Sequence, residues 1–195
     1  FIGAIGASAI VYLMARSRGG LVPLRLILTG VVLAYGFQAI MSLIVFMEPR
    51  GDAARTVMFW MLGSFGGAHW GALPIAAGAV AVICCYLYRN ARRLDVMALG
   101  DATAAGMGVD CVSLRRQLFL LTAIATGALV AVSGAVGFVG LVIPHIVRLV
   151  VGPVHRRVLI LAPLVGAIFL VWVDLVSRVL MPPRELPLGI VTAIV

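Results

Sequence analysis

The sequence has very little charge, and it has no lysine. Charged residues make up 11% of the 195 positions, hydrophobic residues make up 63%, and the mean hydropathy is +1.17. A soluble domain of average composition has about a quarter charged residues. A chain with so few polar side chains cannot cover a surface that faces water, whereas lipid removes that need. The composition excludes an ordinary soluble domain and predicts a membrane protein.

The sequence also lacks the short motifs of common enzyme sites. It has no Gly-Lys-Ser/Thr phosphate-binding loop, no His-Glu-x-x-His zinc motif and no Gly-x-Ser-x-Gly nucleophile motif. Cys84 and Cys85 are adjacent in an apolar run and Cys111 lies in a polar connector, so the cysteines do not have the spacing of metal ligands. We therefore predict that this chain is not an enzyme and binds no metal or cofactor.

All 15 basic residues are arginine, and the net charge is +8. In a soluble protein this charge would suggest a nucleic acid partner. Here the arginines lie in and around short connectors between apolar runs, so we predict no nucleic acid binding. Alternate connectors are rich and poor in arginine, and the positive-inside rule assigns the rich set to the cytoplasm. The rich set contains Arg16, Arg18, Arg25, Arg89, Arg92, Arg93, Arg115, Arg116, Arg148, Arg156 and Arg157, and the poor set contains Arg50, Arg55, Arg178 and Arg184.

A series of apolar runs predicts an all-α, polytopic transmembrane helix bundle that forms a single domain over residues 1–195. Val139–Val151, at about 13 residues or roughly 20 Å as a helix, is shorter than the hydrocarbon thickness. Because Gly134 precedes it and Pro144 interrupts it, we expect a broken or short helix packed inside the protein. The runs are Phe1–Ala15, Leu24–Met47, Ala72–Tyr88, Leu118–Ser133, Val139–Val151, Val158–Leu180 and Leu186–Val195.

Both ends of the sequence fall inside apolar runs. Phe1 is not an initiator methionine, and the first run has neither a charged leading region nor a cleavage site, so it is not a signal peptide. The last run stops at Val195 after about ten residues, whereas a membrane helix needs about 20. We therefore expect an internal fragment, truncated at both ends.

The connector Glu48–Trp70 lies on the predicted outer side. Aromatic residues stand beside glycines in it, as in Phe59, Trp60 and Gly63. This composition favours a short helix that lies along the outer membrane face.

The connector Arg89–Gln117 lies on the predicted inner side and is long for a bundle. Asp101 and Asp110 each precede a stretch of helix-forming residues and are placed as N-caps. Gly106 and Gly108 are placed to end the first of these helices. We expect two short helices on the cytoplasmic surface.

Asp174 lies inside the apolar run Val158–Leu180, where a carboxylate is costly and usually functional. Arg178 follows one helical turn later, so the two side chains can pair. The pair is either a structural ion pair near the outer end of a helix or a functional site. As a functional site it would be a proton or substrate relay, or a receptor contact through Arg178.

The three histidines have different surroundings in the sequence. His145 is either a hydrogen-bonded packing residue or part of a gate. His69 is expected at the outer interface. We expect His155, together with Arg156 and Arg157, to form a solvated cytoplasmic cluster.

Gln38 is the strongly polar side chain in the middle of its apolar run. It either lines a pore or bonds a neighbouring helix. The glycines and proline around the short fifth run are the other places where a gate is expected. The pore or gate candidates are Gln38, Gly137, Gly140, Pro144 and His145.

Three stretches together resemble the permeases of binding-protein-dependent ABC importers for ferric siderophores, haem and cobalamin, the FecCD-type family. Leu99–Val109 resembles the family's Leu-Gly-Asp/Glu…Leu-Gly-Val cytoplasmic segment. Gly137–Arg148 is similar to its Gly-Phe-Val/Ile-Gly-Leu-Val-x-Pro-His-x-x-Arg run. Asp174 and Arg178, followed by Glu185–Gly189, resemble the third stretch. The order and spacing also match, and the resemblance runs through essentially the whole chain.

The resemblance implies a fragment of a permease with roughly ten membrane helices, multi-pass in the bacterial inner membrane. It implies a homodimer with a second permease copy, two ATPase subunits that bind ATP and Mg²⁺, and a periplasmic binding protein. Cargo would pass from periplasm to cytoplasm by alternating access. The resemblance leaves open whether the cargo is a ferric siderophore, haem or cobalamin.

Within this resemblance, residues 95–117 are the segment that couples the permease to the ATPase, and a small Ala/Gly-rich helix suits close contact with a partner. Gly106 departs from the family pattern, in which a longer residue is usual. Arg178 matches an outer-face arginine that pairs with a glutamate of the binding protein. Leu24–Met47 and Leu186–Val195 correspond to the pore-lining helices. The coupling residues implied are Leu99, Gly100, Asp101, Ala102, Ala105, Met107, Gly108 and Val109.

Two other functions compete with this one. A secondary transporter driven by protons would use Asp174 or His145 as the relay, and a requirement for ATP would exclude it. A membrane scaffold without transport activity is the third possibility, and it would have neither a binding-protein partner nor an ATPase partner.

Overall fold

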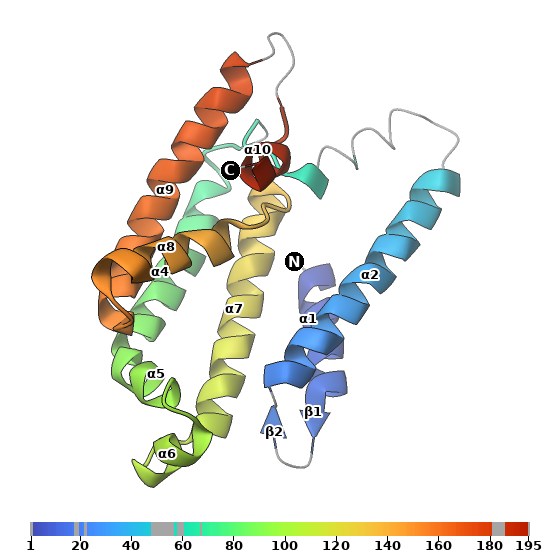
Figure 1. The fold of residues 1–195 in the computed structure, drawn as a ribbon. Coiled ribbons are helices and arrows are strands. Elements are labelled where there is room, and N and C mark those ends of the chain that lie inside the picture. The colour runs from blue at the N-terminus through green and yellow to red at the C-terminus, as the bar shows by residue number, and fades with distance from the viewer. Residues whose placement is uncertain are drawn as a thin grey trace.

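The computed structural model describes residues 2–17, 20–21, 23–47, 57, 61–66, 68–180 and 186–194. Within these residues the chain is a bundle of helices with one very short strand pair (Figure 1). The predicted all-α helix bundle is confirmed apart from that pair. The elements are α1 Ile2–Ala15, β1 Arg16–Ser17, β2 Gly20–Leu21, α2 Pro23–Met47, α4 Leu73–Arg89, α5 Ala91–Met97, α6 Asp101–Gly106, α7 Cys111–Ser133, α8 Val139–Val151, α9 His155–Val179 and α10 Leu188–Ile194.

Three of the described helices, α2, α7 and α9, are long and apolar enough to cross a membrane. Helices α4 and α5 would make a fourth span if taken together, but the chain bends by 63° between them. Helices α1 and α8 are apolar and shorter. These lengths follow from the apolar runs, since about 20 residues of helix match the hydrocarbon thickness.

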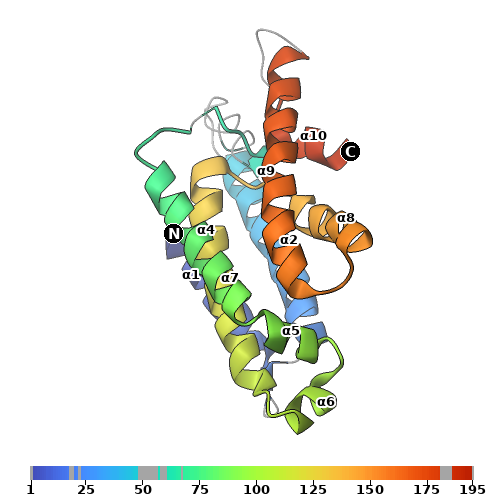
Figure 2. The same cartoon turned by 90° about the vertical axis from the view of Figure 1, so that its left-hand side faces the viewer.

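The long helices pack side by side, with α7 in contact with both α1 and α4 (Figures 1 and 2). Helix α9 contacts α4, α5, α8 and α10. Helices α5 and α6 lie at one end of the bundle with the β1–β2 hairpin (Figure 1). The arginine bias makes this the cytoplasmic end, and the opposite end, where α9 finishes, is called the outer end below.

Small residues bring α1 and α7 close together. A Cβ added to Gly127 of α7 would lie 2.7 Å from the Cβ of Ala4, and Ala125 and Ala128 are buried on the same helix. Tyr12 and Phe119 pack with ring centroids 6.0 Å apart nearer the cytoplasmic end. Membrane helices usually associate through small residues that let their backbones approach closely. Apolar side chains alone do not drive this association, because lipid is as apolar as a neighbouring helix.

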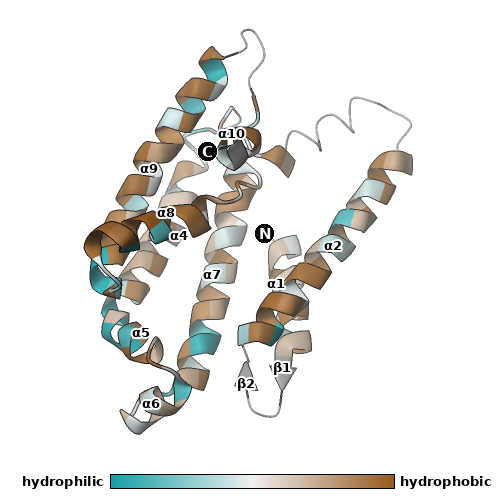
Figure 3. Cartoon of the chain, in the orientation of Figure 1, coloured by the Kyte–Doolittle hydropathy of each residue, from teal (hydrophilic) through white to brown (hydrophobic). Residues whose placement is uncertain are grey.

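Helix α8 has the predicted bounds, Val139–Val151, but the expectation that it is packed inside the protein holds for one side only. Ile143 and Val147 are buried against Val158 of α9. Leu141 and Leu149 of α8 are 78% and 75% exposed. One side of this helix packs on α9, while the other side stays exposed in the described part of the chain. Figure 3 shows that α8 is mostly hydrophobic.

The cytoplasmic connector departs from the prediction in its second helix. The two short helices are α5 and α6, and the residues after Asp110 form the first turns of the long helix α7 instead of a separate helix. Asp110 is the N-cap as predicted, because its Oδ1 accepts a hydrogen bond from the backbone N–H of Ser113 at 3.0 Å. The predicted outer helix within 48–70 falls largely outside the described residues.

Candidate functional site

Two glycines define the limits of the cytoplasmic helix α6. Gly100 precedes it with φ 106° and ψ 151°, and Gly108 follows it with φ 80°. Side chains larger than hydrogen are strained in both conformations. After α6 the N–H groups of Gly108 and Val109 donate to the carbonyls of Ala105 and Ala104 at 3.0 and 2.9 Å. This is a Schellman motif, so Gly108 ends the helix as predicted, while Gly106 is its last helical residue.

Asp101 has a different role from the predicted one. Gly100 is the N-cap and Asp101 is the first helical residue, with no side-chain cap bond. Its two carboxylate oxygens instead lie 2.8 and 3.1 Å from one guanidinium nitrogen of Arg115 in α7. A glycine in the cap position leaves the carboxylate free to reach the neighbouring helix. The prediction that Asp101 caps α6 is therefore wrong, and the residue ties α6 to α7.

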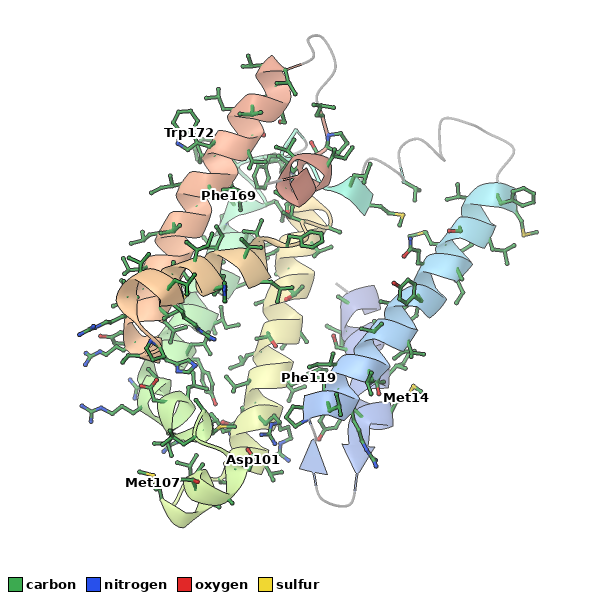
Figure 4. All side chains as sticks on the ribbon, viewed as in Figure 1. Met14, Asp101, Met107, Phe119, Phe169 and Trp172 are labelled. Atoms are coloured by element: carbon green, nitrogen blue, oxygen red, sulfur yellow. The ribbon has the colours of Figure 1, made fainter. Side chains whose placement is uncertain are left out.

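One side of helix α6 is buried and the other side is exposed. Ala104 is fully buried, and Cys111 and Leu114 of α7 are buried in the same region. Leu99 and Met107, at either end of α6, are 67% and 62% exposed, and Figure 4 shows Met107 at the cytoplasmic extremity of the chain. Most of the predicted coupling residues are thus on an exposed surface, with only Val109 half-buried; the exposed ones are Leu99, Gly100, Asp101, Ala102, Ala105, Met107 and Gly108.

A small polar recess lies beside this surface. Its volume is about 190 Å³, and it opens between α5, the turn after α6 and the start of α7. Arg93, Asp110 and Gln117 provide most of its polar groups. An exposed apolar surface next to a polar recess is suited to binding a protein partner.

We expect Gly100→Ala to loosen this segment. Alanine at φ 106° and ψ 151° is strained, so the variant should lose about 1–3 kcal/mol of local stability. Gly106→Ala is the matched control, because Gly106 has ordinary helical geometry and open space for a Cβ. Hydrogen exchange of the α6 amides in the full-length protein measures the difference; equal exchange in the two variants would contradict the expectation.

Of the predicted solvated cluster, Arg156 and Arg157 are exposed, whereas His155 is half-buried and bound by Asp95. Asp95 of α5 accepts the backbone N–H of His155 at 2.9 Å, and His155 Nδ1 lies 2.7 Å from the same oxygen, Oδ1. An ionised carboxylate only accepts hydrogen bonds, so Nδ1 carries the proton. The next residue, Arg156, donates from Nε to the hydroxyl of Tyr88 at 2.7 Å, and its guanidinium lies 5.0 Å from that ring. Local sequence patterns gave no signal of these contacts.

Asp95 lies outside the membrane-spanning segments, in the cytoplasmic helix α5. Burial raises the pKa of Asp95, but the hydrogen bonds and charge of His155 outweigh burial, and the pKa lies below its ordinary value. Because the folded pKa is the lower one, ionised Asp95 stabilises the fold at neutral pH. This stabilisation is lost only as the pH falls through the folded pKa.

At the outer end of α9 the predicted pair is present. Arg178 Nε lies 2.9 Å from Asp174 Oδ2, and the two side chains are 43% and 27% exposed. The hydroxyl of Ser177, which is 2% exposed, donates to the Asp174 carbonyl at 2.7 Å. The N–H of Leu186 donates to the Ser177 carbonyl at 3.2 Å and so leads the chain toward α10.

Near the outer end the start of α10 packs on the segment 61–66. Leu188 is 1% exposed, and its N–H donates to the Gly63 carbonyl at 2.9 Å. A Cβ on Gly189 would lie 2.6 Å from the Leu62 carbonyl oxygen, which is closer than real atoms approach. The two segments therefore touch through backbone.

Gly189→Ala should destabilise this contact. The added methyl meets backbone, which cannot turn away as a side chain can, so we expect a cost of about 1–3 kcal/mol. Gly78→Ala in α4 is the control, since a Cβ there has no neighbour within 4 Å. Thermal unfolding of the full-length protein in detergent should show a lower Tm for the first variant alone.

The structure distributes the pore or gate candidates over two regions. Gln38 is exposed on α2, and α2 and α8 lie on opposite sides of the view in Figure 1. Gly137, Gly140 and His145 are exposed at or near α8, and Pro144 is half-buried within it. Phe138, the N-cap of α8, has φ 63° and ψ −39°, which is a strained backbone conformation for a residue other than glycine. Nothing in the composition predicted this strain.

The sequence profile of the FecCD transport family matches residues 1–195. The chain belongs to this family. The resemblance seen in its motifs is thereby confirmed over the whole length. Family membership and the apolar helices also confirm a multi-pass inner-membrane protein.

FecCD relatives at similar distance have been named for different cargoes. The chain is 38% identical over 196 residues to the Fe(3+)-citrate import system permease protein YfmD of Bacillus subtilis, covering 100% of this chain and 57% of that protein. It is 35% identical over 195 residues to the hemin transport system permease protein HmuU of Yersinia pestis, covering 100% and 58%. It is 37% identical over 199 residues to the cobalamin import system permease protein BtuC of Halobacterium salinarum, covering 100% and 52%.

A solved structure shares the fold. It shows an inward-facing conformation of an ABC transporter assigned to the metal-chelate type, with a TM-score of 0.89 and 32% sequence identity. The match covers 98% of this chain and 60% of that one. The chain thus spans a little over half the length of these three FecCD relatives, each of which is named as a permease.

Proposed function

We propose that the chain is part of the membrane-spanning subunit of an ATP-driven importer that carries a ferric siderophore, haem or cobalamin from periplasm to cytoplasm by alternating access. The observation that carries the proposal is α6. It is a six-residue helix with two glycines at its limits, tied to α7 and exposed at the cytoplasmic end. Such a rigid, small-residue projection serves as a contact for a moving partner.

The partner at α6 is an ATPase subunit that binds ATP and Mg²⁺. The small side chains of Ala102 and Ala105 allow close approach, and Leu99 and Met107 supply apolar area at the two ends of the contact. Asp101 holds the helix on α7 through Arg115 at 2.8 Å, so a push on α6 moves α7 as well. The proposed assembly has two such ATPases under two copies of the permease, and this chain itself binds no cofactor.

The partner at the outer end is a periplasmic binding protein. Arg178 is 43% exposed and lies at the last turn of α9, where a carboxylate of the docked protein can reach it. Asp174 orients the guanidinium from one turn below. Charged contacts at the rim of an interface mainly raise the association rate and the specificity of docking.

The cargo path is assigned to α2 and α10. No residue of α2 is buried by the described part of the chain, and Gln38 offers a polar group midway along it. We assign the gate to α8, where Gly137, Gly140 and Pro144 lie near the strained Phe138. A path with few charged side chains suits a large chelate that must pass without being held.

Proteoliposomes that hold the full-length permease and its ATPase test the proposal. Loaded binding protein is added outside, ATP is enclosed, and uptake of ferric siderophore, haem and cobalamin is compared. We expect accumulation of one cargo that depends on ATP. Accumulation that follows a pH gradient without ATP would instead favour the proton-driven transporter, with Asp174 or His145 as relay.

A further inference from the structure

The first turn of α9 holds a bend in another part of the chain. Helices α4 and α5 meet at Asn90 with an angle of 63°. On the α4 side of the bend Tyr88 accepts a hydrogen bond from Arg156, and on the α5 side Asp95 binds His155. Two successive residues of α9 thus bind to both sides of the bend, which we call the elbow (residues 88–95).

The Asp95 carboxylate is bound at the place on α9 where it stabilises most. The first N–H groups of a helix have no partner within the helix, and the helix dipole favours a negative charge there. Val154, the N-cap of α9, makes no side-chain cap bond. Asp95 fills this role from another helix, since it accepts the His155 N–H at 2.9 Å.

The elbow is also connected to the exposed residues of and beside α6, Leu99–Gly108, which we call the coupling surface. Helix α5 leads through Ala98, Leu99 and Gly100 into α6, and the two short helices pack on each other. Ala91, the first residue of α5, is 2% exposed. A displacement of α6 therefore also displaces α5 and, through Asp95, acts on the start of α9. Figure 3 shows hydrophilic residues at α5 and at the first turn of α9.

Helix α9 is one continuous helix from the elbow to the outer end, with Pro163 inside it. It has 25 residues, which corresponds to about 37 Å at 1.5 Å per residue. Its last turns carry Asp174 and Arg178, and the Ser177 carbonyl binds the chain that enters α10. Because α9 is one continuous helix, a displacement of the end bound at the elbow also displaces the outer end, although Pro163 removes one backbone hydrogen bond between them.

We propose that the contact between Asp95 and His155 is the joint through which movement of the coupling surface reaches α9, and with it the binding-protein contact and α10. This inference rests on the proposed function. Asp95 and His155 are positioning residues, since neither touches cargo or ATP. Loss of the joint should leave the ATPase working while separating it from events at the outer face.

The test uses the full-length permease with its ATPase in proteoliposomes, and measures the ratio of ATPase activity with loaded binding protein to activity without it. We expect Asp95→Ala, which removes both bonds to His155, to lower this ratio about tenfold. His155→Ala keeps the backbone N–H bond to Asp95 and should lower the ratio less. The double variant should be no worse than Asp95→Ala alone, because that variant already removes the whole contact.

Tyr12→Ala is the control. Tyr12 of α1 packs on Phe119 of α7 with ring centroids 6.0 Å apart, and neither residue belongs to the elbow or to residues 95–117. The stimulation ratio of this variant should stay within about twofold of the wild type. Equal losses in Asp95→Ala and Tyr12→Ala would show a general effect of a weakened helix contact and would contradict the proposed joint.

A second measurement is independent of transport. Hydrogen exchange in the assembled complex should rise in Asp95→Ala both at α5 and at residues 155–158, and in Tyr12→Ala at neither place. Unchanged exchange at residues 155–158 would contradict the proposal that Asp95 holds the start of α9. If the wild type shows no ATP-driven uptake, the proposed function fails, and the exchange result still decides whether Asp95 holds α9.

Discussion

Ala105→Trp should abolish ATP-driven uptake while leaving the protein folded. Ala105 is exposed on α6, so the added ring enters solvent in the isolated permease and costs it little. In the assembly the same ring occupies the space into which the ATPase must fit. We expect uptake to fall at least 100-fold, which corresponds to about 2.7 kcal/mol, with an unchanged Tm.

Two further variants isolate the cause. Ala104→Trp places the same ring one residue away at a fully buried position, and should lower the Tm because the interface with α7 has no room for it. Arg92→Trp places it at an exposed position of α5 outside residues 95–117, and should keep most of the uptake. Normal uptake by Ala105→Trp would show that α6 does not contact the ATPase.

Arg178→Glu should weaken docking of the binding protein without affecting the ATPase by itself. Reversal of the charge replaces an attraction by a repulsion at the proposed contact. Interface charge pairs that are truncated cost about 2–5 kcal/mol when buried, and a partly exposed residue belongs at the lower end or below. We expect the concentration of loaded binding protein at half-maximal uptake to rise about 10- to 100-fold.

The matched controls for this variant separate docking from a relay. Arg157→Glu makes the same change at the opposite end of α9 and should leave the half-maximal concentration unchanged. Asp174→Asn keeps the shape of the carboxyl group but cannot carry a proton. Uptake by Asp174→Asn within a few-fold of the wild type supports docking, whereas complete loss in Asp174→Asn with normal docking in Arg178→Glu would make Asp174 a relay.

Features that depend on near neighbours were predictable from the sequence. The bounds of α8, the cap by Asp110 and the pair of Asp174 with Arg178 all involve residues within a few positions of each other. A helix repeats every 3.6 residues, so a spacing of three or four states directly which side chains meet. The apolar runs likewise predicted α2, α9 and the part of α7 from Leu118 onward, because membrane thickness sets the length of a spanning helix. The first turns of α7, which begins at Cys111, were expected to form a separate helix.

Features that depend on distant contacts were not predictable in this way. Asp101 has the residue type and place of an N-cap, yet Arg115 binds it from α7. His155 stands beside two arginines and was expected in solvent, yet Asp95 binds it from α5, and the two are separated by 60 positions. A local pattern cannot state which of several arginines or carboxylates another helix will present, because that depends on how the helices pack.

The same separation sets the order in which the chain can be assembled during synthesis. At about 5–20 residues per second, the 60 positions between Asp95 and His155 take about 3–12 s to translate. Helices α7 and α8 are made in this interval, while the elbow between α4 and α5 still lacks the helix that holds it. The elbow is therefore synthesised before the helix that holds it, and the contacts of Tyr88 and Asp95 with α9 form only when α9 arrives.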